Sequence, residues 1–167
     1  MKPFAIGVTK LLKDPSRPMH FDLRGTLKNA YVTFSKVAED EVVAVQGVVE
    51  SVHQGLLVTA EIETRWQGSC VRCLEDASSN IQVKVRELFE PQGVGEQDSY
   101  HFEGDVLDLT ELIKDFVVLE LPVVPLCASD CKGLCSTCGQ NLNEGGCDCA
   151  KDDIDPRWSK LSSLSDG

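Results

Sequence analysis

The sequence predicts an α+β fold, in which an antiparallel β-sheet is covered by one main helix and carries a zinc-stapled C-terminal appendage. Three observations predict it: apolar and polar residues alternate through much of the first ninety residues, one amphipathic segment follows residue 108, and six cysteines fall within residues 127–149. A chain of 167 residues is long enough for one core plus an appendage. We expect a β-rich α+β domain over residues 1–126, and a Cys-rich zinc-binding appendage and tail over residues 127–167.

The strand signals come first along the chain. Residues 41–50 are rich in valine, a turn is expected at 53–55, and residues 57–66 alternate with apolar side chains at every second position. Residues 81–86 repeat the alternation. This pattern is typical of an antiparallel hairpin with one face buried and the other exposed to solvent. It makes residues 68–80 the connection between two strands, and Cys70 and Cys73 lie in that connection.

One main helix follows a polar, glycine-rich stretch over residues 91–106, which we expect to be a surface loop. Asp108 is the expected N-cap, with Glu111 three residues later as in a capping box. Pro122 and Pro125 end the helix and lead into the cysteine-rich segment. Its apolar stripe comprises Leu109, Leu112, Ile113, Phe116 and Val117. Beyond the cysteines, residues 155–164 predict a short helix.

The cysteines favour metal binding over disulfides. The N-terminus lacks the apolar stretch of a secretory signal, so we expect a reducing, cytoplasmic location, where Cys-x-x-Cys spacing more often indicates zinc than a disulfide or a redox pair. No apolar run approaches the roughly 18 residues of a membrane helix. Glycine after a Cys-x-x-Cys pair lets backbone amides approach the thiolates.

Eight cysteines divide into two sets of four, the number of ligands that zinc prefers. A compact partition pairs Cys135 and Cys138 with Cys147 and Cys149. The second site then joins Cys70 and Cys73 to Cys127 and Cys131, about two zinc ions per chain in all. A rival partition has one zinc, held by Cys131, Cys135, Cys138 and Cys147, and leaves four free thiols.

Ligands that are all thiolates indicate structural rather than hydrolytic sites. The three histidines do not neighbour a cysteine pair, and no phosphate-binding loop, nucleophile elbow or His-Glu-x-x-His motif is present. We therefore expect neither an enzyme nor a small-molecule substrate.

The charge is unevenly distributed. The chain carries a net charge of −11, yet residues 1–36 hold seven basic residues against two acids. Such asymmetry permits a basic contact surface on an acidic body, with Phe21, Tyr31 and Phe34 as stacking groups; the alternative is an ordinary solvated face. The candidate RNA contacts are Lys10, Lys13, Arg17, Arg24 and Lys28.

An ordered string of motifs resembles the YceD family, the large ribosomal RNA subunit accumulation proteins of bacteria and plastids. It comprises Cys70-Val-Arg-Cys73-Leu74, Leu121-Pro-Val-Val-Pro-Leu126, Cys131-Lys-Gly-Leu-Cys135, Cys138-Gly-Gln-Asn-Leu-Asn143, Cys147-Asp-Cys149 and Asp155-Pro-Arg-Trp158. The resemblance covers roughly residues 20–164.

The resemblance implies a role in the synthesis, processing or stability of large-subunit, 23S-type ribosomal RNA, with that RNA or a large-subunit ribosomal protein as the partner. We expect a non-catalytic ribosome biogenesis factor. Two alternatives stay open: a redox-sensing zinc protein or chaperone, and an acidic module that docks a basic ribosomal protein.

Overall fold

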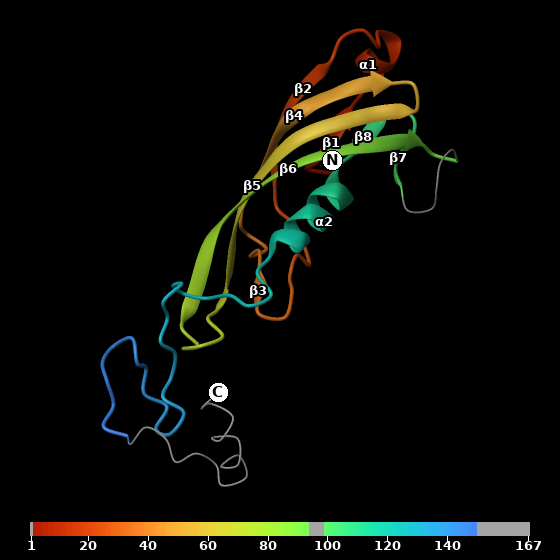
Figure 1. Cartoon of the computed structure of the whole chain (residues 1–167). Helices are drawn as coiled ribbons and strands as arrows, with labels where there is room; N and C mark the ends of the chain where they lie inside the picture. The colour runs from red at the N-terminus through yellow and green to blue at the C-terminus, as the bar shows by residue number, and fades with distance from the viewer. Residues whose placement is uncertain (1, 94–98, 150–167) are drawn as a thin grey trace, which may run out of the picture.

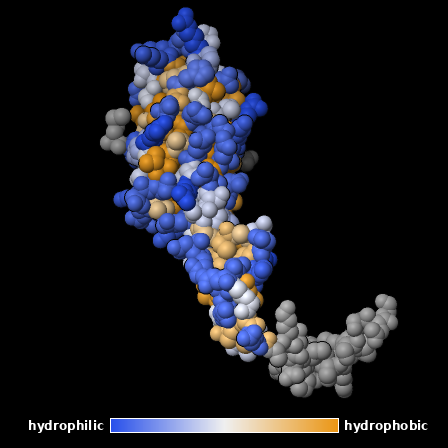
Figure 2. Space-filling view, turned by 90° about the vertical axis from the view of Figure 1, so that its left-hand side faces the viewer, coloured by the Kyte–Doolittle hydropathy of each residue, from blue (hydrophilic) through white to orange (hydrophobic). Residues whose placement is uncertain are grey.

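A computed structural model describes residues 2–93 and 99–149 of the chain. Its elements are, in order, β1 (Ala5–Gly7), α1 (Thr9–Lys13), β2 (Met19–Gly25), β3 (Ser35–Lys36), β4 (Val43–Val52), β5 (Gly55–Ser69), β6 (Asp76–Pro91), β7 (Tyr100–Phe102), β8 (Val106–Asp108) and α2 (Thr110–Glu120). Figure 1 shows an elongated molecule, with α1 at one end of a long twisted sheet and the cysteine-rich segment at the other. Figure 2 shows the same outline from the side, where that segment is narrower than the body.

The main sheet has the strand order β2-β4-β5-β6-β7, and β3 adds to β5. All of these pairs are antiparallel except β6 with β7. A second sheet consists of β1 and β8. A fold built mainly of antiparallel sheet with few helices, as the sequence predicts, is therefore confirmed, whereas the proposed domain boundary at residue 126 stays a prediction.

The predicted alternation in β5 is confirmed. Val58, Ala60, Ile62, Thr64 and Trp66 are buried and face the core, whereas the residues between them are exposed or half-buried. Antiparallel pairing with β4 and β6 over most of its length explains why so long a strand is stable.

The main helix α2 packs against β6 and buries Leu112, Ile113 and Val117. Leu109 rather than Asp108 is the N-cap residue, so the predicted capping box is wrong by one position. Asp108 still supports the helix start, because its Oδ1 accepts a 3.0 Å hydrogen bond from the backbone N–H of Thr110. The helix ends at Glu120, directly before Leu121-Pro122, as predicted.

Two predicted loops are shorter than expected. β5 runs to Ser69 and β6 begins at Asp76, so the connection is residues 70–75 rather than 68–80. The segment 76–80 is polar and resembles a turn in sequence, but cross-strand pairing with residues 65–69 overrides that weak local preference.

The predicted loop at 91–106 likewise contains β7 and the start of β8. The elements β1, α1, β2 and β3 have no counterpart in the sequence-based prediction. Residues 94–98 of the predicted loop and the predicted short helix at 155–164 lie outside the described residues. Across residues 2–93 and 99–149, neither helix has the length and apolar character needed to cross a bilayer.

Candidate metal centre

The eight cysteines form two groups of four in which all sulfur atoms lie within 4.8 Å of one another. We call Cys70, Cys73, Cys127 and Cys131 site A. We call Cys135, Cys138, Cys147 and Cys149 site B. All eight thiols are free. Each group could hold a metal ion.

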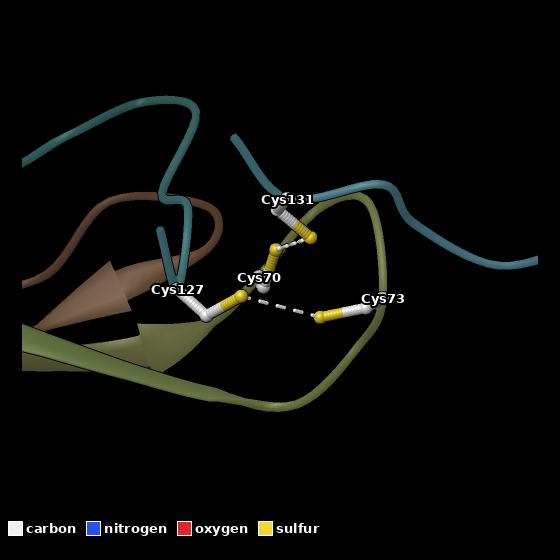
Figure 3. A group of neighbouring side chains, drawn as sticks. All are labelled: Cys70, Cys73, Cys127 and Cys131. Atoms are coloured by element: carbon white, nitrogen blue, oxygen red, sulfur yellow. Dashed lines mark hydrogen bonds between the residues drawn. The ribbon is translucent and has the colours of Figure 1, made fainter. Parts of the chain in front are cut away.

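Site A joins two parts of the chain that are distant in sequence (Figure 3). Cys70 and Cys73 lie in the turn between β5 and β6, whereas Cys127 and Cys131 follow α2. The turn is tight: the N–H of Cys70 bonds to the carbonyl of Glu75 at 2.8 Å, and that of Leu74 to the carbonyl of Cys70 at 2.9 Å. These bonds aim both sulfur atoms of the turn toward the segment after α2.

Backbone contacts hold the two parts of site A together. The N–H of Val71 donates to the carbonyl of Pro125 at 3.0 Å. Nearby, the Ser35 hydroxyl donates to the carbonyl of Pro122 at 2.8 Å. Ser35 can lie there because Gly68 has no side chain: a Cβ on Gly68 would be 2.1 Å from the carbonyl oxygen of Phe34. The segment after α2 is thus anchored both to the turn between β5 and β6 and to β3.

The sulfur distances in site A suit a tetrahedral metal. Cys70 Sγ lies 3.7 Å from Cys131 Sγ, and Cys73 Sγ lies 3.5 Å from Cys127 Sγ. A zinc ion with Zn–S bonds of about 2.3 Å holds its sulfur ligands about 3.8 Å apart, whereas a disulfide bond is about 2.05 Å long. Site A therefore has the dimensions of a four-thiolate metal site rather than of two disulfides.

Site A is largely closed to solvent. Cys70, Cys73 and Cys131 are at most 3% exposed, and only Cys127 reaches the surface. Two polar side chains touch its Cys131 end. Arg72 Nη1 donates to the carbonyl oxygen of Cys131 at 2.9 Å, and Asn143 Nδ2 donates to Cys131 Sγ at 3.3 Å.

These contacts divide the thiols of site A by their readiness to ionise. Burial opposes ionisation of Cys70, but neighbouring backbone N–H groups, that of Cys127 first among them, lower its pKa to about 6. The Asn143 amide lowers the pKa of Cys131. Hydrogen bonding to Cys73 raises the pKa of Cys127 to about 12. Cys70 and Cys131 therefore ionise more readily than an ordinary thiol, and a bound cation would favour ionisation of the remaining thiols.

Site B is built on a small hairpin. The N–H of Cys135 bonds to the carbonyl of Gln140 at 2.8 Å, and the N–H of Gly139 bonds to the carbonyl of Cys135 at 2.9 Å. Gly139 has a φ of +75°, which glycine adopts without strain. Backbone N–H groups of Cys138 and Thr137 lower the pKa of Cys135 to about 6. The four thiols are half-buried or exposed, so site B is the more accessible of the two.

The two groups are those of the two-site partition. The rival set of Cys131, Cys135, Cys138 and Cys147 is divided between sites A and B. Sequence analysis missed Arg72 and Asn143, the side chains that contact Cys131. The signal for Asn143 was its place in the turn-rich segment between two cysteine pairs, where an amide can donate to a thiolate.

The structure brings three of the five predicted RNA contacts together. Lys10, Lys13 and Arg17 line one shallow depression of about 440 Å³ beside α1, and Arg17 pairs with Asp14 at 3.4 Å. Arg24 lies on β2 and Lys28 in the following loop, both exposed. Of the three aromatic residues, Tyr31 and Phe34 are more than half exposed, whereas Phe21 packs against the core.

Comparison with known proteins gives a family match and several relatives. The family described as "Large ribosomal RNA subunit accumulation protein YceD" matches residues 58–165. An uncharacterized protein of Mycobacterium tuberculosis is 34% identical over 97% of this chain and 81% of its own length. An Arabidopsis thaliana protein named as a chloroplastic YCED homolog, large ribosomal RNA subunit accumulation protein, is 39% identical over 41% of this chain and 22% of its own length. No solved structure matches the chain.

Proposed function

Because the chain belongs to the YceD family, we propose that it is a non-catalytic ribosome biogenesis factor that supports the synthesis, processing or stability of large-subunit, 23S-type ribosomal RNA. The observation that carries this proposal is the extent of the match. Residues 58–165 include most of β5, all of β6 and α2, and all eight cysteines. The matched region thus contains both cysteine groups and the strands and helix that position them.

Sites A and B would each hold one zinc ion, about two per chain by the four-ligand rule. Four thiolates fill the tetrahedral coordination sphere of zinc and leave no position for an activated water molecule. This ligand set supports structural roles for both metals and a function without catalysis. Cysteines that bind zinc rather than form disulfides are typical of a reducing compartment, and a location in the cytoplasm is part of the proposal.

The direct partner is ribosomal RNA or a ribosomal protein of the large subunit. The depression lined by Lys10, Lys13 and Arg17 supports contact with RNA phosphates, because three cations and a single acid, Asp14, lie close together on an otherwise acidic protein.

Docking of a basic ribosomal protein is the second candidate. Exposed apolar side chains, among them Phe34, Val123 and Val124, flank the Ser35–Pro122 contact near site A, and the net charge of −11 favours a basic partner.

The test is depletion of the protein in cells, followed by analysis of ribosomal RNA and by crosslinking of the tagged protein. We expect large-subunit precursors to accumulate and mature large-subunit RNA to decrease, with the small subunit comparatively spared. Crosslinked large-subunit RNA supports direct RNA contact, whereas a crosslinked large-subunit protein supports protein docking. Normal maturation of both subunits after depletion would contradict the proposal.

A further inference from the structure

The two cysteine sites are physically connected by a short hairpin. Only residues 132–134 separate Cys131 of site A from Cys135 of site B. Leu134 forms a β-bridge with Asn141, and the N–H of Leu142 bonds to the carbonyl of Gly133 at 2.9 Å. The residues that enclose site B therefore begin directly at the edge of site A.

One side chain of this hairpin segment, Asn143, reaches back to site A. Its Nδ2 donates to Cys131 Sγ at 3.3 Å and to Asn141 Oδ1 at 2.8 Å. Its Oδ1 accepts a 2.8 Å hydrogen bond from the backbone N–H of Lys132. The NH₂ group of the amide thus donates two hydrogen bonds, and its oxygen accepts one.

This network fixes the orientation of the Asn143 amide. If the amide were rotated by half a turn, its NH₂ group would face the N–H of Lys132, and its oxygen would face the sulfur of Cys131. Both contacts would then be repulsive, a donor against a donor and an acceptor against a thiolate. The observed orientation is the one that gives Cys131 a hydrogen-bond donor.

The turn of site A holds the same hairpin from the other side. The carbonyl of Arg72 accepts a hydrogen bond from the N–H of Leu134 at 3.1 Å, and its guanidinium group donates to the carbonyl of Cys131. The approach is close at Gly133, which has a φ of +77° and whose Cβ would lie 3.1 Å from the Arg72 carbonyl oxygen. The hairpin therefore docks on site A in one defined position.

We propose that Asn143 is a positioning residue for site A, and that through it the binding of metal at site B strengthens the binding of metal at site A. The inference rests on the proposed metal binding. Metal at site B holds residues 135–149 in the conformation that presents Asn143 to Cys131. A zinc ion with four thiolates carries an excess of negative charge on sulfur, and an N–H donor to one sulfur stabilises that charge.

The difference in burial sets the order of events. Site A is largely closed to solvent, so few water molecules can replace the amide if it is lost. Site B is more exposed and releases its metal to a chelator first. Release at site B frees the hairpin, and release at site A then becomes faster.

The test follows zinc release from the full-length, zinc-loaded protein to a coloured chelator. The release phase that disappears when Cys147 and Cys149 are replaced by Ser belongs to site B, and the other phase belongs to site A. We expect Asn143→Ala to speed release from site A by roughly tenfold to a hundredfold, the usual effect of removing a hydrogen-bond partner of a metal ligand. In the variant that lacks Cys147 and Cys149, site A already releases zinc faster, and Asn143→Ala should add little.

Two further variants separate the hydrogen bond from the packing. Asn143→Asp keeps the shape and the acceptor for Lys132 but turns a carboxylate oxygen toward Cys131, so release from site A should be at least as fast as in Asn143→Ala. Gln140→Ala is the matched control, because it keeps the backbone carbonyl that bonds to Cys135 and removes only an exposed side chain that makes no hydrogen bond among the described residues. It should release zinc like the wild type.

The outcomes are distinct. Unchanged release from site A in both Asn143 variants overturns the inference, as does an equal acceleration by Asn143→Ala with and without site B. Purified protein that binds no zinc contradicts the proposed metal sites instead. Two zinc ions released independently of one another leave the metal sites in place and overturn only their coupling.

Discussion

The sulfur atoms of Cys70 and Cys131 lie 3.7 Å apart although the two cysteines are 61 positions apart in sequence. Cys70 sits in the turn at the end of β5, and Cys131 follows α2. A metal held between them would cross-link the sheet to the end of the helix. The first two predictions depend on this relationship.

The first prediction concerns metal content. The chain has two groups of four thiols, and within each group the sulfur atoms lie within 4.8 Å of one another. It should therefore bind about two zinc ions by the four-ligand rule. Elemental analysis of protein purified without added metal measures the ratio. Replacing Cys135 and Cys138 by Ser should reduce it to one. One zinc ion and four titratable thiols in the wild type would contradict the two-site assignment.

The second prediction concerns stability. Replacing Cys70 and Cys73 by Ser removes a cross-link that closes a loop of 61 residues, and the chain-entropy relation for cross-links puts its loss at about 4 kcal/mol of unfolding free energy. Denaturant unfolding followed by far-UV circular dichroism measures the change. The comparison variant replaces Cys147 and Cys149, which should loosen the site B hairpin and lower the unfolding free energy of the sheet by less than the loss of site A itself. If both double variants unfold with the same curve as the wild type, the thiols are not structural.

The third prediction concerns pH. The pKa values of Cys70 and Cys135 fall from an ordinary value of 9.0 to about 6 in the folded protein. The stability that their thiolates contribute is therefore fully present above about pH 9 and is lost as pH falls toward 6. The raised pKa of Cys127, about 12, has the opposite effect and acts only above pH 9. Because metals bind thiolates and protons compete for the same sulfur atoms, zinc retention should fall as the pH is lowered.

Zinc retained after dialysis at pH 5, 6, 7 and 8 checks this expectation. Retention that does not depend on pH over this range would contradict the thiolate assignment of the two sites.

The fourth prediction concerns RNA. The double variant Lys10→Glu and Lys13→Glu should weaken binding to large-subunit RNA and flatten its salt dependence, because fewer counterions are released from the phosphates. The control variant Lys84→Glu and Arg86→Glu makes the same change of charge on exposed positions of β6. Fluorescence anisotropy at several salt concentrations measures both. Equal losses in the two variants would indicate a general charge effect rather than a contact at α1.

Much of the sheet and the main helix could be predicted from sequence, because alternation in β5 and the apolar stripe of α2 follow directly from one buried face. Residues 76–80 could not, because their polar composition indicates a turn and only pairing with β5 makes them a strand. The strands β1, β7 and β8 are three residues long, too short for a periodic pattern to show.

The cysteine sites, too, could be predicted from the sequence only in part. Cysteine spacing indicated two groups of four, since the number of ligands per zinc limits the partitions. The contacts of Arg72 and Asn143 with Cys131 depend on how two distant turns meet, and spacing along the chain carries no information about that.

The length of the hairpin formed by β5 and β6 has a mechanical consequence. Its paired positions run from Leu56 with Phe89 to Ser69 with Asp76, a span of roughly 40 Å at about 3.3 Å per residue. Continuous cross-strand hydrogen bonding makes such a ribbon stiff along its axis. The hairpin therefore keeps the turn that carries Cys70 and Cys73 at a fixed distance from the opposite end of the sheet.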